Sequence, residues 1–239
     1  MRLDVYLYEN GYARSRARAQ EMVKSGLVKL NGKVAKKPSI NTDPYEVTVE
    51  EDHPYVSRAA LKLKKALDTW NISVEGKVAI DIGASTGGFT QVLCEAGAEK
   101  VYAVDVGTDQ LASEVKALPQ VVDMSRTDGR DLMPGQFDPK PTVLVSDLSF
   151  ISCTKVLPFV FEEITTVKEI VCLVKPQFEL SPQAINKSGL VKDESLYEEA
   201  IQSVKSMFED EGYTVKDLMD SPVRGGDGNK EFLLHAEKA

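Results

Sequence analysis

The chain has 239 residues, which is enough for a large domain joined to a small one. Its 42% hydrophobic and 28% charged residues exclude a fibrous or disordered chain. No apolar run approaches the roughly 18 residues of a membrane span, and Met1-Arg2-Leu3-Asp4-Val5 lacks the apolar core of a signal peptide, so we expect a cytoplasmic protein without stable membrane association.

The net charge of −8 is unevenly distributed along the chain. Residues 1–47 hold nine Lys and Arg against five Asp and Glu, a balance of +4, which leaves 20 against 32, a balance of −12, for the rest. Because phosphate affinity comes mainly from lysine and arginine, this distribution predicts a basic module that docks on nucleic acid and an acidic module that carries the chemistry.

Cysteine and histidine are too few and too scattered to predict a disulfide framework or a metal site. Cys94, Cys153 and Cys172 show no CxxC spacing, and we interpret them as buried apolar thiols. His53 and His235 are the two histidines of the chain, and we interpret both as structural or incidental. We therefore expect no bound metal.

The N-terminal segment predicts a compact helix, helix, hairpin module. Ser15 is a suitable cap for a helix over 16–24, which Gly26 closes. Asn31-Gly32 stands between two short strand-forming runs and predicts a tight hairpin, since both residues tolerate positive φ. We expect this module to occupy residues 1–50, followed by a linker over 51–57 and a second domain over 58–239.

The second domain begins with a predicted amphipathic helix over 59–67 that follows Ser57, and then alternates strands with helices. Short apolar runs predict buried strands at 78–80, 101–104, 143–145 and 170–174, and a strand is expected before Asp128. A helix over 196–210 and two strands, 213–218 and 231–235, complete the pattern. This order is typical of an α/β doubly wound, mostly parallel sheet that binds its ligand at the carboxyl ends of the strands.

A glycine-rich turn, Asp81 to Thr90, lies between the first strand of this domain and a helix. It lacks the G-x-G-x-x-G order of dinucleotide sites and the G-K-[ST] of phosphate-binding loops. An acidic residue at the first strand end suits an ammonium group, Asp105 at the next suits two ribose hydroxyls, and Asp128 suits an adenine amino group. A ligand with these three parts is S-adenosylmethionine, for which we predict contacts from Asp81, Gly83, Ala84, Ser85, Thr86, Gly87, Gly88, Phe89, Asp105, Val106, Asp128, Gly129 and Asp147.

Several motifs are spread over nearly the whole length of the chain. They are Arg2-Leu3-Asp4 with Ser15 to Asn31-Gly32, Tyr55-Val56-Ser57-Arg58, the Gly83 turn, Ser146-Asp147-Leu148-Ser149-Phe150, Lys175-Pro176-Gln177-Phe178-Glu179 and Gly228-Asn229-Lys230-Glu231. In these motifs the chain resembles the TlyA family, often labelled haemolysin-like. The resemblance implies a Rossmann-like, FtsJ-type ribose methyltransferase with a mostly parallel seven-stranded sheet. It also implies a small α+β RNA-binding domain like that of ribosomal small-subunit protein four.

FtsJ-type enzymes use a Lys-Asp-Lys-Glu tetrad, and the resemblance assigns it to Lys62, Asp147, Lys175 and Glu231. A ribose 2′-hydroxyl is a weak nucleophile that needs positioning and a route for its proton. Lys175 is expected to act as the base or to stabilise the alkoxide, with the carboxylates orienting the two lysines. The substrate implied is ribosomal RNA or a ribosomal subunit, modified at a cytidine; the target nucleotide and the oligomeric state stay open.

Basic residues of the small module and its junction are expected to contact RNA phosphates. They are Arg2, Arg14, Arg16, Arg18, Lys24, Lys33 and Arg58. Four alternatives remain: methylation of a base amino group, methylation of a base carbon by a cysteine nucleophile, a non-catalytic RNA-binding or ribosome-assembly factor, and a haemolysin that acts on membranes. The Ser146 to Phe150 motif lacks the Pro-Pro-aromatic turn of amino-group enzymes, and Cys153 lacks the Pro-Cys setting of carbon-methylating ones.

Overall fold

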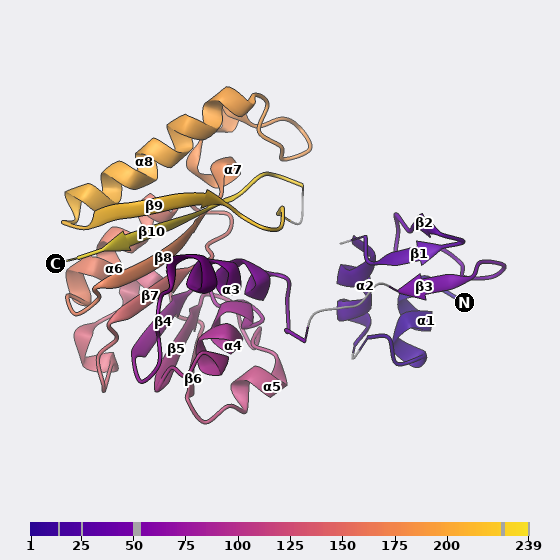
Figure 1. Cartoon of the computed structure of the whole chain (residues 1–239), viewed down its shortest axis with the longest axis horizontal. Coiled ribbons are helices and arrows are strands. Elements are labelled where there is room, and N and C mark those ends of the chain that lie inside the picture. Colours follow the sequence, from indigo (N-terminus) through magenta and orange to yellow (C-terminus); the bar gives the residue numbers. More distant parts are fainter. Residues whose placement is uncertain (14, 25, 50–53, 226–227, 239) are drawn as a thin grey trace. The chain divides into compact units, whose positions relative to one another are not determined.

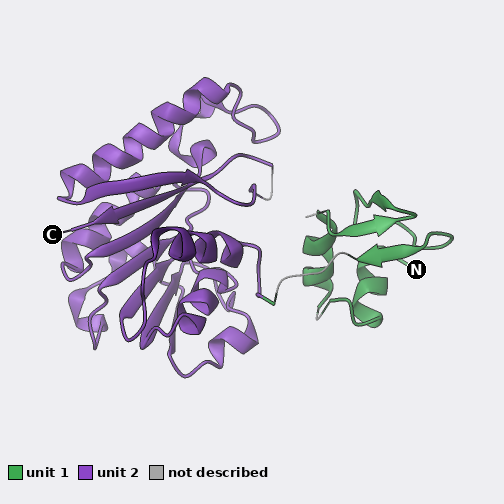
Figure 2. Cartoon of the chain, viewed as in Figure 1, with its two compact units in different colours: residues 1–54 green, residues 55–239 purple. Residues whose placement is uncertain are grey.

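A computed structural model of the chain describes every residue except 14, 25, 50–53, 226–227 and 239. It divides into two compact units, Met1–Pro54 and Tyr55–Ala239 (Figure 2). The predicted RNA contact Arg14, the histidine His53 and the first residues of the predicted linker, 51–53, lie outside the described residues.

The smaller unit has the predicted helix, helix, hairpin order and one further strand (Figure 1). Helices α1 (Leu3–Glu9) and α2 (Arg16–Lys24) precede an antiparallel sheet in the order β2-β1-β3, formed by Lys33–Val34, Val28–Leu30 and Val47–Val49. Asn31 and Gly32 both have positive φ, 48° and 74°, as the tight turn requires. The Ser15 side chain caps α2 by accepting a hydrogen bond of 3.1 Å from the Arg18 amide.

The larger unit contains the predicted doubly wound sheet, with seven strands in the order β6-β5-β4-β7-β8-β10-β9. The strands are β4 (Val78–Ile82), β5 (Lys100–Asp105), β6 (Val121–Ser125), β7 (Val143–Ser146), β8 (Glu169–Val174), β9 (Thr214–Asp220) and β10 (Phe232–Glu237). The helices are α3 (Ala59–Trp70), α4 (Gly88–Glu95), α5 (Ser113–Lys116), α6 (Leu157–Glu163), α7 (Pro176–Glu179) and α8 (Tyr197–Asp210).

Successive side chains along a strand point to opposite faces of the sheet, so the buried strands divide the core into two layers, one on each face. In β4, Ile80 and Ile82 belong to the layer beneath α6 and α8, whereas Ala79 belongs to the layer beneath α3 and α4. Strands buried on both faces read as continuous apolar runs, which is why the sequence identified them. Within the described part of the chain, no helix is long and apolar enough to cross a membrane.

The pairing of β10 determines where the site forms. Strands β4, β5, β7 and β8 run parallel, so their carboxyl ends share one edge of the sheet. β10 pairs with β8 antiparallel, with Phe232 opposite Val174. The residue before β10, Glu231, therefore lies at the same edge as Lys175, the residue after β8.

Candidate active site

The four tetrad residues form two ion pairs at the carboxyl edge of the sheet. Lys175 Nζ lies 2.5 Å from Asp147 Oδ1, and Lys62 Nζ lies 2.6 Å from Glu231 Oε2. Asp147, Lys175 and Glu231 adjoin three neighbouring strands, β7, β8 and β10, while Lys62 is in α3. Lys62 and Lys175 are each 7% exposed and Glu231 is 3% exposed, so these charges are stabilised mainly by their partners rather than by water.

Two residues beside the tetrad were not among the predicted site residues. Lys175 Nζ also donates a hydrogen bond of 2.7 Å to Ser149 Oγ. Phe150 is 92% exposed, more than any other large apolar side chain in the described part of the chain, and its φ is +66°. Its ring lies 5.3 Å from that of Phe178. A positive φ at a bulky residue is an uncommon, strained conformation that often marks a functional position.

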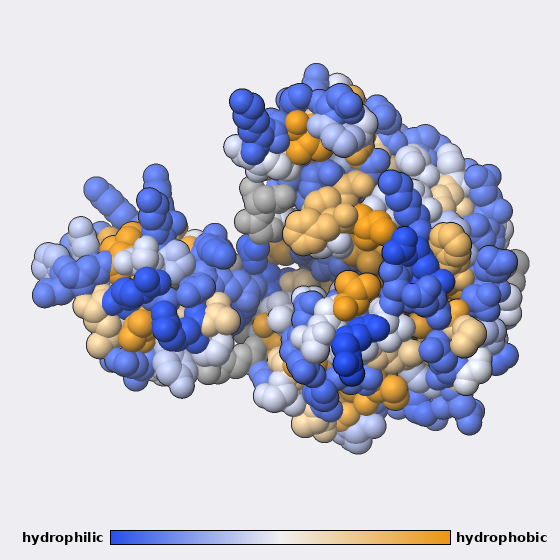
Figure 3. All heavy atoms as spheres, turned by 180° about the vertical axis from the view of Figure 1, so that it is seen from behind, coloured by the Kyte–Doolittle hydropathy of each residue, from blue (hydrophilic) through white to orange (hydrophobic). Residues whose placement is uncertain are grey.

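On the face of the larger unit that Figure 3 shows, apolar side chains form small groups between hydrophilic ones. Scattered exposure of this kind is ordinary for a protein surface. Phe150 differs because it is exposed beside buried charged residues, where its ring offers a stacking surface to a ligand with a flat apolar face.

The glycine turn approaches the end of β7 very closely. Gly83 has a φ of +88°, and a Cβ at this position would lie 2.9 Å from the backbone oxygen of Asp147. Gly87 has a φ of +93°, and a Cβ there would lie 2.8 Å from side-chain atoms of Leu111 and Val115. The turn therefore needs glycine both for its backbone conformation and for the space that it occupies.

A cavity of about 490 Å³ lies beside this turn. Five of the predicted cofactor residues line it, namely Ser85, Asp105, Val106, Asp128 and Gly129, together with Gln110, Arg130, Leu148, Ser149, Phe150, Ile151 and Val156. Asp105 is held by two backbone amides, since Oδ2 accepts from Ser85 N at 2.8 Å and Oδ1 accepts from Gly107 N at 2.7 Å. Asp128 pairs with Arg130, whose hydrogen bonds lower the pKa of that carboxyl.

The other predicted cofactor residues, Asp147 among them, do not line the cavity. Phe89 is buried in the core beneath α3, and a Cβ on Gly88 would lie 3.1 Å from Ala60 N of that helix. Ala84 is buried, and Thr86 accepts a backbone hydrogen bond from Ala112. These residues shape the turn, because α4 begins at Gly88 and must pack against α3.

Asp81 is fully buried at the base of the turn. Its Oδ2 accepts a hydrogen bond of 2.7 Å from Thr90 Oγ1, whereas its Oδ1 has no hydrogen-bond partner among the described residues. Burial raises the pKa of Asp81 to about 7. A buried carboxylate oxygen without a partner is costly, and it fits a site completed by a positively charged or hydrogen-bonding ligand.

The predicted RNA contacts of the smaller unit divide into two kinds. Arg2 and Arg16 are half-exposed and both pair with the buried Asp4, at 2.9 and 3.1 Å, and hydrogen bonds from Arg2 hold the pKa of Asp4 well below its usual range. Lys24 and Lys33 are exposed. Arg18 was expected to project from the surface but is only 6% exposed and pairs with Glu21. It lies on the buried face of α2, at helical spacing from Met22.

Arg58, the remaining predicted RNA contact, directly precedes α3 in the larger unit and is partly buried.

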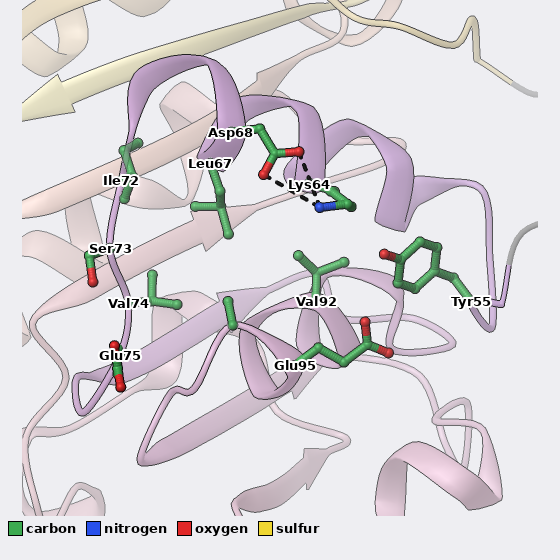
Figure 4. A pocket seen from close by; sticks show the side chains of 11 residues that line it. Tyr55, Lys64, Leu67, Asp68, Ile72, Ser73, Val74, Glu75, Val92 and Glu95 are labelled. Carbon is green, nitrogen blue, oxygen red and sulfur yellow. Dashed lines mark hydrogen bonds and ion pairs between the residues drawn. The ribbon is translucent and has the colours of Figure 1, made fainter.

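A second hollow of about 310 Å³ lies between α3 and α4 (Figure 4). Leu67, Val74 and Val92 contribute apolar walls, and the ion pair Lys64–Asp68 lies at its edge. It contains none of the predicted site residues.

His235 lies at the opposite end of β10 and takes part in an ion-pair cluster. Its Nε2 is 2.7 Å from Glu169 and 3.5 Å from Glu237, so these three side chains offer grouped potential metal ligands. Each carboxylate also has a lysine partner. Lys77 Nζ lies 3.7 Å from Glu169 Oε2, and Lys216 Nζ lies 3.1 Å from Glu237 Oε2. The lysines offset the negative charge that would attract a cation, so a structural cluster explains the arrangement.

The buried pair Lys62–Glu231 predicts a large effect on stability. Glu231→Ala leaves Lys62 buried without its counter-charge and is expected to lower the free energy of unfolding by about 3–5 kcal/mol. Asp68→Ala in the exposed pair Lys64–Asp68 (3.1 Å) is the matched control, expected to cost less than about 1 kcal/mol. Denaturant unfolding followed by circular dichroism measures both, and equal losses would contradict the burial argument.

Comparison with known proteins gives concordant results for the two units. Residues 55–238 match the family model described as FtsJ-like methyltransferase, and residues 1–44 match the S4 domain. Hemolysin A of Brachyspira hyodysenteriae is 41% identical over 98% of this chain and 99% of its own length. The 16S/23S rRNA (cytidine-2'-O)-methyltransferase TlyA of Mycobacterium tuberculosis is 38% identical over 98% of this chain and 88% of its own length. A solved structure of a protein from Streptococcus thermophilus is 41% identical, with a TM-score of 0.79, and the match covers 100% of this chain and 88% of that one.

Proposed function

This chain belongs to the TlyA family of FtsJ-like methyltransferases, and on that premise we propose that it transfers a methyl group from S-adenosylmethionine to a cytidine 2′-hydroxyl in ribosomal RNA. The observation that carries the proposal is the pair of buried lysine–carboxylate contacts at the carboxyl edge of the sheet, next to the glycine turn. A positioned amine beside a donor site is what alkylation of a weak hydroxyl nucleophile requires.

The residues around the cavity fit S-adenosylmethionine. Asp105 is suited to accept from ribose hydroxyls, and Asp128 and Gly129 border the place for an adenine. The Oδ1 of Asp81, which has no hydrogen-bond partner among the described residues, suits the ammonium group at the amino acid end of the ligand. When bound, the cofactor supplies a methyl group on a positively charged sulfur, which is a good leaving group.

Lys175 has the contacts of a residue that handles the proton of the 2′-hydroxyl. In its neutral amine form, Lys175 would accept the proton that the hydroxyl loses, and Asp147 would stabilise the ammonium so formed; Asp147 and Ser149 orient the amine from two sides. Lys62 is held by Glu231, which lies at the same edge of the sheet as Lys175. Asp147 and Glu231 limit the repulsion between the two lysines.

Recognition of RNA is assigned to both units. The smaller unit offers Arg2, Arg16, Lys24 and Lys33 for phosphate contacts, which position a substrate without reading its sequence. In the larger unit, the exposed ring of Phe150 offers a stacking surface at the cavity. Proteins that modify or read unpaired RNA bases commonly stack them on aromatic side chains.

The test is methyl transfer to ribosomal subunits and to protein-free ribosomal RNA, using S-adenosylmethionine with a labelled methyl group. We expect labelled 2′-O-methylcytidine after digestion to nucleosides and mass analysis. A label on a base would establish base methylation instead, and RNA binding without any methylated product would establish an assembly factor. Leakage of lipid vesicles without added cofactor would support the haemolysin alternative.

A further inference from the structure

The segment that follows β7 is joined to the segment that follows β8 by a series of contacts in matching order. The two segments are residues 147–153 and 175–179. Lys175 contacts Asp147 and Ser149, the ring of Phe178 lies 5.3 Å from Phe150, and Glu179 bonds Ser152 and Cys153. We call this set of contacts the loop clamp.

Glu179 forms the end of the loop clamp that is farthest from Lys175. Its carboxylate accepts a hydrogen bond from Ser152 Oγ and another, of 3.0 Å, from Cys153 N. Ser152 in turn caps the 3-10 helix Cys153–Lys155, because its Oγ accepts from Thr154 N at 3.2 Å. One side chain thus connects α7 to the start of the helix that ends the loop.

The loop between these anchors needs to be held. Phe150 has a positive φ and almost no side-chain burial, so neither local conformation nor packing in the core favours its position. Such conformations persist only where the surrounding structure determines them. The hydrogen-bonded anchors on either side are Ser149, on Lys175, and the pair Ser152–Cys153, on Glu179, while Leu148 and Ile151 pack, partly buried, against the core.

We propose that Glu179 is a positioning residue for methyl transfer, which fixes residues 148–153 so that Ser149 stays on Lys175 and Phe150 stays at the cavity. Glu179 does not line the cavity and acts through the loop. The inference rests on the proposed function, because it specifies how that same site is held in place.

The experiment compares Glu179→Ala, Ser152→Ala, the double variant and Glu179→Gln in the full chain. The readouts are the single-turnover rate of methyl transfer, the affinity for S-adenosylmethionine and the midpoint of thermal unfolding. Glu179→Ala is expected to slow methyl transfer by about 100-fold, as a small displacement near the reacting groups does. The affinity for S-adenosylmethionine is expected to fall by less than the rate, because residues 148–151 form one side of the cavity while Asp105 keeps its hydrogen bonds on the other.

Two further outcomes distinguish positioning from general stability. Glu179→Gln keeps an oxygen for Cys153 N and is expected to restore the rate to within about fivefold of wild type. Replacing Glu179 in the Ser152→Ala background is expected to cost less than in wild type, because the two side chains act through one contact. The control is Glu162→Ala, an exposed glutamate in α6, expected to behave as wild type.

The proposal is overturned if Glu179→Ala turns over at the wild-type rate while wild type methylates RNA. It is also overturned if rate, cofactor affinity and unfolding midpoint fall together and Glu179→Gln fails to restore them. A wild-type protein without methyl transfer would instead overturn the proposed function, and this inference with it.

Discussion

Lys175→Ala is expected to lower the single-turnover rate of methyl transfer by at least about 1,000-fold while leaving the affinity for S-adenosylmethionine nearly unchanged. The variant removes the amine that contacts Asp147 at 2.5 Å and Ser149 at 2.7 Å, and with it the acceptor for the hydroxyl proton. General acid–base catalysis alone contributes about 10²–10⁴-fold. Lys175 does not line the cavity assigned to the cofactor, so cofactor binding is expected to persist.

Lys175→Arg distinguishes a Lys175 that accepts a proton from a Lys175 that only supplies positive charge. Arginine keeps the positive charge but is not deprotonated in proteins, so a base at this position predicts that Lys175→Arg is nearly as slow as Lys175→Ala. Recovery of most of the rate would instead assign Lys175 to stabilising the oxyanion. Lys168→Ala, an exposed lysine just before the other end of β8, is the matched control and is expected to be fully active. Full activity in Lys175→Ala would reject any catalytic role.

The fold could be predicted from the sequence because its buried strands and its tight turn each have a recognisable residue pattern. Strands buried on both faces gave continuous apolar runs, and Asn31-Gly32 specified its turn by chemistry alone. The antiparallel pairing of β10 was different. Nothing in residues 231–235 distinguishes a parallel strand from an antiparallel one, yet that pairing brings Glu231 to the edge that holds Lys175.

The candidate site was predictable in its residue types but not in its pairings. Family motifs pointed to the four tetrad residues, whereas the division into Lys62–Glu231 and Lys175–Asp147 depends on contacts between residues 169 positions apart in one case. Phe150 is exposed and has a positive φ, and sequence patterns specify neither property. The burial of Arg18 could have been predicted from its helical spacing from Met22. The prediction instead grouped Arg18 with the other basic residues of the segment.

Gly83→Ala is expected to lower kcat/KM for methyl transfer by about 100–10,000-fold. Alanine at a φ of +88° is strained, which costs on the order of 1–3 kcal/mol. Its Cβ would also lie 2.9 Å from the backbone oxygen of Asp147, so either the turn or the end of β7 must shift. A shift of the turn disturbs the Ser85 amide that donates to Asp105, and a shift of β7 displaces the carboxylate that orients Lys175. Each displacement costs about 10–100-fold, and the two act on binding and on rate respectively.

The matched control is Gly135→Ala, in the 3-10 turn Pro134–Gln136, where an added Cβ meets nothing within 4 Å. This variant is expected to bind the cofactor and turn over as wild type does. Isothermal titration with S-adenosylmethionine and single-turnover methyl transfer measure the two losses in Gly83→Ala separately. If the affinity falls but the rate at saturating cofactor is unchanged, the added Cβ has displaced only the glycine turn, and Asp147 has kept its position. If both the affinity and the rate equal those of wild type, the structure accommodates the added Cβ without any effect on the site. That result would contradict the proposed coupling between the glycine turn and the tetrad.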